Sequence, residues 1–425
     1  MTEKLIELLK NSRADAWEVT ESQETGWEFY LIRHRLDQHR TKRLETISLK
    51  VYRSLEEGKF LGSAGATLPP DATEQEMQKL IDGLYEDAAY VRNPFYRLNQ
   101  PVREETAEES PTDLARVSAD FLKTMRSLQE TATEDLNSYE IFVSDVRTRY
   151  RNSEGVDVTS RSPSSMVEAV VNARQHEKEI ELYRLYHCGT CDAVQLTHDL
   201  NETLRIGRDR LAARATPALG KADVVFSTEA SAEIYGWFIA HLMTDMVYRK
   251  MSDWKIGEDI CPDRKGDAVT VKSLRFLPNS SCNGAFDREG APVQDRTLME
   301  AGVPLAFTGS RQFSQYLGLE NSYIPGNLEV TGGTANAESL REGTCLEVME
   351  FSDFQVDTMT GDIAGEIRLA YLHENGNHIP VSGGSISGNM QDFLGTMRMS
   401  RESAQYNSLR IPAVTRLQGV NIAGA

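Results

Sequence analysis

The order of apolar and polar residues predicts a first region of helices and strands, residues 1–220. Leu5–Leu9 begins a short helix, because its apolar residues share one helical face. Segments that alternate apolar and polar residues, with many β-branched and aromatic side chains, predict strands. They are Trp27–Arg35, Leu44–Arg53, Phe60–Ala66, Tyr139–Tyr150, Met166–Ala173 and Glu179–His187, and the last three are expected to share one sheet.

Three more helices are predicted in this region. Thr73–Glu76 is a capping box, in which a threonine and a glutamate three residues later bond each other's backbone, and apolar residues follow it at helical spacing. Ser110 is expected to cap the next helix, with a proline at its first position. Another helix is expected over Asp199–Arg214. The acidic stretch Arg103–Ser110 is expected to be a solvated connector.

The second region, residues 221–425, is expected to hold one long helix, Glu229–Lys250, and otherwise short strands and glycine turns. Asn375-Gly376 between two alternating segments is the signal of a type I′ hairpin. Strands and helices do not alternate as they do in a doubly wound parallel sheet. The predicted fold class is therefore α+β. Residues 1–220 form a domain of helices on a mixed sheet, and residues 221–425 form a mostly β domain with one long helix.

Composition and charge argue against several classes of protein. The chain is 40% hydrophobic and 26% charged, which is ordinary for a globular protein. Its net charge of −18 opposes non-specific binding to nucleic acid. No segment approaches the roughly 20 apolar residues of a membrane span, and Glu7 interrupts the first apolar run, so no signal peptide is expected. Five scattered cysteines are typical of reduced thiols, which predicts a cytoplasmic protein.

The long helix carries one candidate metal ligand. His241 lies on its apolar side, between Phe238 and Leu242, and Asp245 follows one turn later. The two side chains could both bind a metal, but a zinc site needs at least three protein ligands. The pattern favours the alternative, a buried histidine that is hydrogen-bonded to Asp245 or to backbone.

Other candidate motifs are incomplete. Cys188 and Cys191 form one Cys-x-x-Cys pair, whereas a structural zinc would require a second pair and a redox dithiol would require a thioredoxin-like setting. His176-Glu177 has no second histidine one helical turn later, so it is not a zinc-protease motif. The residues by themselves therefore predict a soluble two-domain α+β protein with no catalytic and no cofactor-binding residue.

An ordered series of short segments nevertheless resembles the TldD/PmbA family, also called the modulator of DNA gyrase family. In the second region these segments are Val224–Lys250, Phe286–Pro292, Leu298–Gly302, Thr360–Asp362, Gly388-Asn389 and Ile411-Pro412. In the first region, Asn152-Ser153-Glu154-Gly155 is similar to that family's Asn-Ser-x-Gly turn. The resemblance covers most of the chain.

The resemblance points to one of two kinds of family member. The TldD kind carries His-Glu-x-x-x-His on the helix and a late cysteine that completes a zinc site. The TldE, or PmbA, kind lacks these residues and pairs with TldD in a heterodimeric protease that digests unfolded peptides. Here the helix positions start with Gly236 and Trp237 and end with His241, and the late segment is Tyr406–Arg410. Glycine cannot bind zinc and tryptophan cannot act as a general base, so the chain resembles the TldE kind.

The resemblance implies a TldE/PmbA-like subunit of a zinc metallopeptidase, inactive alone, with zinc in a TldD-like partner and unfolded peptides as substrates. It implies no metal in this chain, where His241 is a vestige of the site. Asp287, Glu289 and Asn152 become candidates for the cleft that handles peptide. The alternative for the two carboxylates is a turn in which they accept backbone hydrogen bonds.

Two other functions and one assembly stay open. The chain could be an autonomous metallopeptidase with a degenerate site that uses His241. It could instead be a non-enzymatic regulator of a gyrase or toxin–antitoxin pathway. A homodimer is also open, whereas no nucleic-acid or membrane partner is expected.

Overall fold

The computed structural model describes residues 1–102, 110–320 and 322–425. The predicted connector Arg103–Ser110 lies, except for its last residue, outside the described residues. The first region is built on a seven-stranded sheet in the order β4-β3-β2-β1-β5-β6-β7. Its strands are β1 Ala16–Ile32, β2 Arg35–Leu55, β3 Phe60–Leu68, β4 Asn93–Pro94, β5 Glu134–Asn152, β6 Asp157–Gln175 and β7 Lys178–Cys188.

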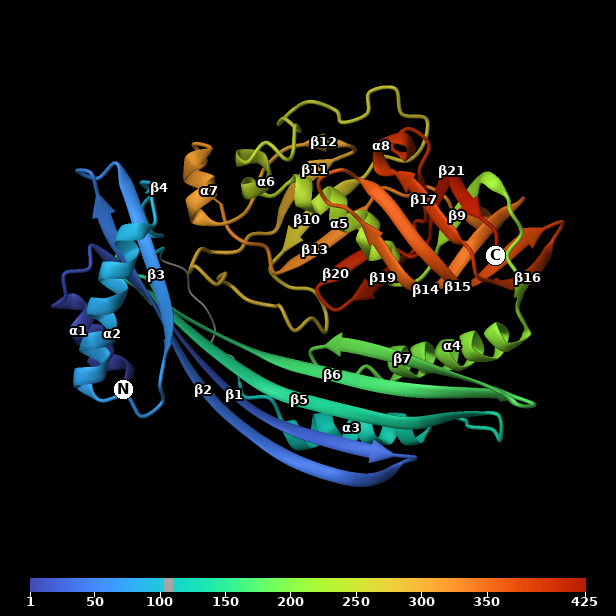
Figure 1. Cartoon of the computed structure of the whole chain (residues 1–425), viewed down its shortest axis with the longest axis horizontal. Helices are drawn as coiled ribbons and strands as arrows, with labels where there is room; N and C mark the ends of the chain where they lie inside the picture. The colour runs from blue at the N-terminus through green and yellow to red at the C-terminus, as the bar shows by residue number, and fades with distance from the viewer. Residues whose placement is uncertain (103–109, 321) are drawn as a thin grey trace.

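The four longest of these strands form a curved sheet that extends beneath the second region (Figure 1). Each neighbouring pair is antiparallel, so the sheet that was expected to be mixed is antiparallel throughout. β5, β6 and β7 share this sheet, as predicted.

Four helices pack on the sheet of the first region. α1 (Thr2–Lys10) and α2 (Glu74–Asp87) bury leucine, isoleucine and methionine side chains against β1 and β2. α3 (Leu114–Arg126) and α4 (Ala193–Ala212) cover the part of the sheet formed by β5, β6 and β7. The capping box at Thr73 is confirmed, since its hydroxyl accepts a bond from the Glu76 amide and the Glu76 carboxylate accepts one from the Thr73 amide.

Two predicted helix starts are wrong. Asp113, not Ser110, caps α3, and its carboxylate accepts a bond from the Arg116 amide. Thr112 is held outside the helix, because its amide and hydroxyl both donate to Asp145 at 2.9 Å. α4 begins six residues before the predicted Asp199, because the side chain of Asp192 caps it.

The second region contains a closed ring of five strands. β14 (Cys345–Val356) pairs with β9 (Gly220–Phe226), and the ring continues through β21 (Thr415–Ala423), β17 (Ser385–Asn389) and β15 (Asp362–Glu374) back to β14. The smaller strands β8, β16 and β18 extend this sheet; they are Arg214–Ala215, Asn377–Ser382 and Arg398–Met399.

A separate six-stranded sheet has the order β12-β11-β10-β13-β20-β19. Its strands are β10 Thr270–Leu274, β11 Arg296–Glu300, β12 Val303–Pro304, β13 Asn327–Thr331, β19 Ser403–Tyr406 and β20 Leu409–Pro412. The short helices α7 (Arg311–Tyr316) and α8 (Met390–Phe393) lie in connections. The hairpin predicted at Asn375-Gly376 joins β15 to β16 with the positive φ values, 52° and 79°, that a type I′ turn requires.

The predicted long helix Glu229–Lys250 is two helices. α5 (Ser231–His241) ends at His241, and α6 (Thr244–Tyr248) follows a break at Leu242 and Met243. The break forms because the Thr244 amide donates to the Thr308 carbonyl at 2.9 Å instead of to the preceding turn. This bond turns the residues after His241 away from the axis of α5.

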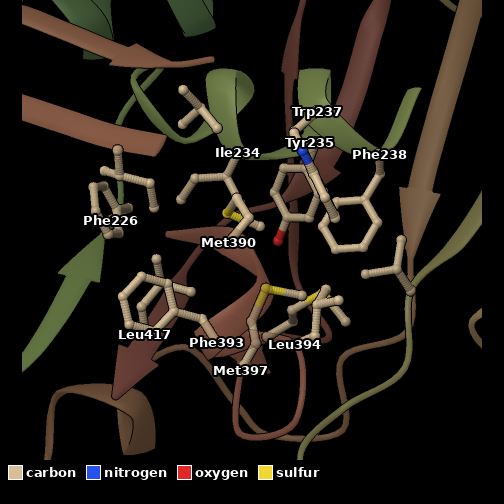
Figure 2. Close-up of a cluster of buried hydrophobic side chains, with 14 of the residues drawn as sticks. Phe226, Ile234, Tyr235, Trp237, Phe238, Met390, Phe393, Leu394, Met397 and Leu417 are labelled. Carbon is tan, nitrogen blue, oxygen red and sulfur yellow. The ribbon is translucent and has the colours of Figure 1, made fainter. Parts of the chain in front are cut away.

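α5 lies against the core of the second region. Figure 2 shows Ile234, Tyr235 and Phe238 of α5 facing a cluster that includes Met390, Phe393 and Leu417. The two regions also share a core, since Leu369 and Tyr371 of β15 belong to the same buried cluster as the apolar residues of α4. The fold class α+β is confirmed, and the division at residue 220 stays a prediction. In the described ranges, no helix is long and apolar enough to cross a membrane.

Candidate functional site

In α5, the position that the resemblance assigns to a catalytic base is occupied by a buried aromatic side chain, Trp237. Trp237 is 1% exposed, and its ring meets those of Phe238 and Trp254 edge to face, at 5.0 and 5.4 Å between centroids. At Gly236, an added Cβ would meet no heavy atom within 4 Å. The first motif position therefore faces open space without a ligand, and the second is filled by core packing.

His241, the surviving motif residue, is buried among tryptophans. Its ring is 3% exposed and stacks on Trp254 at 4.8 Å. Neither ring nitrogen has a partner with good hydrogen-bond geometry among the described residues. Of the two predicted partners, Asp245 or backbone, Asp245 is therefore wrong. The helix break explains this, because it moves Asp245 onto α6. Burial lowers the pKa of His241, although Asp253 and the Thr358 backbone favour the charged form.

The described residues contain no group of three or more His, Cys, Asp or Glu side chains that could hold a metal ion. A zinc ion needs at least three protein ligands with free lone pairs. The residues around α5 therefore do not fit zinc.

The late segment Tyr406–Arg410 lies beside α5. It forms the turn between β19 and β20, and β20 packs against α5. Asn407 is at the turn with φ 49°, and its amide side chain exchanges hydrogen bonds with the Ser281 amide and hydroxyl, each at 2.9 Å. The fold thus places this late segment beside α5, and neither of the two supplies a set of metal ligands.

A large cleft opens where α5 begins. It has a volume of about 1100 Å³ and lies between the two regions. Its walls come from β7 and α4 on one side and from α5, β14 and β19 on the other. The carboxyl groups of Asp199, Glu229 and Glu233 line it, and burial raises the pKa of each. Repulsion from Asp199 adds to the rise at Glu229. The cleft is therefore a candidate binding site.

The two cysteines of the Cys-x-x-Cys pair line two neighbouring cavities. Cys188 lines a cavity of about 480 Å³ that shares Tyr186 and Tyr406 with the large cleft, and Cys191 lines another of about 810 Å³. Burial raises the pKa of Cys188 to about 12 and also raises that of Cys191. Since the thiolate is the reactive and metal-binding form, these environments disfavour both roles at neutral pH.

Asn152, Asp287 and Glu289 meet at the junction of the two regions. The Asn152 side chain donates to the Asn99 carbonyl at 2.8 Å, and the Asn99 side chain donates to the Glu289 carbonyl at 3.0 Å. Asn152 also accepts bonds from two amides of its own turn, Glu154 and Val156. The fold therefore brings the three predicted cleft residues together, although none of them lines the large cleft.

The two carboxylates at this junction accept backbone hydrogen bonds. Asp287 accepts from the amides of Glu289, Ala291 and Ile324 at 2.7–2.9 Å. The Glu289 carboxylate accepts from the Arg311 amide at 2.7 Å. Burial raises the pKa of both groups, and repulsion from Asp287 adds to the rise at Glu289. This geometry is that of turn-stabilising groups.

The sequence did not predict one cluster of polar side chains, which is centred on the buried Glu347. Glu347 accepts hydrogen bonds from the Ser227 hydroxyl at 2.6 Å and from Arg341 at 2.8 Å, and its other oxygen meets His373 at 2.9 Å. Ser227 and Arg341 line the large cleft. The serine donates to the carboxylate rather than to the histidine, so the arrangement lacks the base that would activate a nucleophilic serine.

The second region of the chain matches a known protein family. Residues 219–424 match a family described as the PmbA/TldA metallopeptidase C-terminal domain. Metalloprotease PmbA of Escherichia coli O157:H7 is 26% identical over 205 residues, which is 45% of this chain and 45% of that protein. The match thus spans less than half the length of this curated relative.

Two solved structures share the whole fold. A putative modulator of DNA gyrase from Thermotoga maritima superposes with a TM-score of 0.78 at 17% identity and covers 99% of each chain. TldE from Thermococcus kodakarensis superposes with a TM-score of 0.76 at 16% identity and covers 100% of each chain. The resemblance to the TldD/PmbA family that the sequence predicted is confirmed.

Proposed function

Taking this chain as a metallopeptidase-related protein of the PmbA/TldD family, we propose that it is the non-catalytic, TldE-like subunit of a zinc metallopeptidase. The partner is a TldD-like chain that carries the zinc, and the substrates are unfolded peptides. The proposal rests on the residues that α5 has at the positions of the zinc motif. Gly236 and Trp237 replace a zinc ligand and the general base, and the surviving His241 is buried among aromatic rings.

Zinc proteolysis needs a metal that polarises the scissile carbonyl and a base that activates water. This chain supplies neither around α5. An autonomous peptidase would have to use His241 as a ligand, whereas this residue is 3% exposed and its ring packs against Trp237 and Trp254.

The large cleft supports a part in handling peptide. Its volume of about 1100 Å³ exceeds the ordinary size range of a small-molecule site, about 300–1,000 Å³. Its walls combine the aromatic rings of Tyr186 and Tyr406 with charged groups such as Arg184 and Glu350. A surface of this kind can receive varied side chains, which is what an unfolded peptide presents.

The isolated chain should contain no stoichiometric zinc. Metal analysis of the purified, dialysed chain should find far less than one zinc per chain, because the ligand set is missing around α5. A TldD-like chain with an intact His-Glu-x-x-x-His, dialysed in the same way, is the matched control and should retain zinc. About one zinc per molecule of this chain would contradict the proposal.

A further inference from the structure

The long sheet of the first region has a second face, opposite α3 and α4. In β7, Leu182 is buried beneath α4, whereas the alternate residues Tyr183, Leu185 and His187 are exposed. The register continues this second face across the neighbouring strands. Val170 lies opposite Tyr183, Glu168 opposite Leu185, and Met166 opposite His187. We call this side of the sheet the outer face; it comprises these residues of β6 and β7 and the residues of β1 and β5 that lie in register with them.

The outer face is more apolar than a solvated sheet face usually is. Tyr183 is 55% exposed and Leu185 36% exposed, and on β1 Ile32 at the end of the strand is 55% exposed. Tyr30 of β1 and Phe142 of β5 are half-buried beside them, and their rings meet edge to face at 5.9 Å. One-sided antiparallel sheets ordinarily direct polar residues to solvent. Exposed apolar side chains on a sheet face that no other element of the described chain covers are a feature of interaction surfaces.

Carboxylates lie between these apolar side chains. Glu140 of β5 is directly opposite Glu168 of β6, and Tyr30 lies opposite Glu140 on the other side. The Tyr183 hydroxyl donates to Glu168 at 2.9 Å, so that this carboxylate is held in place. Like charges directly opposite each other destabilise a sheet. Burial raises the pKa of Glu140, and repulsion from Glu168 adds to the rise, opposed by Arg40.

We propose that the outer face is the docking surface for a folded partner chain that presents lysine or arginine side chains around an apolar centre. The inference rests on the proposed function in taking the TldD-like subunit as that partner. Cationic groups of the partner would relieve the repulsion between Glu140 and Glu168, and its apolar side chains would cover Tyr183, Leu185 and Ile32.

Two other occupants fit the observations less well. In a symmetric dimer of this chain, the same patch would face itself, which would bring the Glu140–Glu168 pairs together on molecules of net charge −18. A single extended peptide is narrower than the patch. The patch runs across β1, β5, β6 and β7, and four strands about 4.8 Å apart give a width of roughly 14 Å.

The test is titration of the full-length chain with the His-Glu-x-x-x-His-bearing homologue from the same source, followed by calorimetry. Tyr183→Ala should raise the dissociation constant about tenfold or more, because a large exposed aromatic side chain that an interface buries contributes strongly to binding. Tyr90→Ala removes an equally large side chain that is 88% exposed on another part of the first region, and should leave the constant unchanged.

Glu140→Gln gives a readout that a purely structural role would not produce. It should leave the isolated chain at least as stable as the parent, because it removes a like-charge contact, yet it should weaken binding and reduce its dependence on salt. Parent-like binding by both Tyr183→Ala and Glu140→Gln would overturn the proposal. So would competition for this face by an unstructured peptide, or a homodimer that Tyr183→Ala dissociates.

The same titration separates the docking proposal from the proposed function. If Tyr183→Ala weakens binding but the complex with the parent chain does not change peptide cleavage, the docking surface is retained and the proposed function is rejected. If the chain speeds peptide cleavage by the homologue but Tyr183→Ala leaves binding unchanged, the proposed function is retained and the docking surface is rejected. Absence of any complex would reject both.

Discussion

Replacing Trp237 by alanine should lower the free energy of unfolding by about 3–5 kcal/mol, the usual range for removing a large buried aromatic side chain. Trp237 is 1% exposed and contacts Phe238, His241 and Trp254. Its neighbours belong to two chain segments joined to different strands, so they cannot easily close around the cavity. Urea unfolding followed by circular dichroism measures the change.

His241→Ala is the matched comparison on the same helix face. It should lower stability by about 1–3 kcal/mol, since it leaves a smaller cavity and its ring nitrogens lack good hydrogen-bond partners. His241→Leu should be close to neutral, because a hydrophobic side chain of similar size replaces an unsatisfied polar ring. If Trp237→Ala lowers the free energy of unfolding by less than about 1 kcal/mol, this would contradict the view that Trp237 in α5 serves core packing.

Replacing Glu347 by alanine should lower stability by about 3–5 kcal/mol, the range for breaking a buried ion pair by removal of one partner. The substitution would leave His373, which is 4% exposed, and the guanidinium of Arg341 without their carboxylate. Glu347→Gln keeps the shape and an acceptor oxygen but removes the charge, so its loss should be smaller. An effect of alanine no larger than that of glutamine would contradict the assignment.

The same carboxylate predicts a dependence of stability on pH. Although burial raises the pKa of Glu347, the hydrogen bonds from His373 and Ser227 and the charge of Arg341 outweigh it and lower the pKa from 4.5 to about 2. Because the folded-state pKa lies below the unfolded value, the ionised carboxylate contributes its full stabilisation above pH 4.5. This stabilisation is lost as the pH falls from 4.5 towards 2. The parent should therefore lose stability more steeply in this window than Glu347→Gln, as measured by urea unfolding at several pH values.

Features that depend on neighbouring residues could be predicted from the sequence. The capping box at Thr73 and the hairpin at Asn375-Gly376 each involve residues within four positions of one another, and both are confirmed. The break after α5 could not be predicted, because it depends on a bond from Thr244 to Thr308 in a distant segment. The start of α3 was misplaced for the same reason, since Thr112 bonds Asp145 across the sheet.

The candidate site was only partly predictable. Loss of the zinc motif could be seen from Gly236 and Trp237, because ligand chemistry depends on residue type. The group around Glu347 could not be found, since Ser227, Arg341 and His373 come together only through the pairing of β9, β14 and β15. The outer face was equally hidden, because the alternation in β7 does not show which of its two sides the helices cover.

The central claim is that this chain completes a peptidase without catalysing the reaction itself, and peptide cleavage tests it most directly. An unstructured peptide should be incubated with this chain, with the TldD-like homologue from the same source, and with both together. The account predicts no cleavage by this chain alone and markedly faster cleavage by the mixture than by the homologue alone. Metal-dependent cleavage by this chain alone, or a homologue whose rate is indifferent to its presence, would contradict the account.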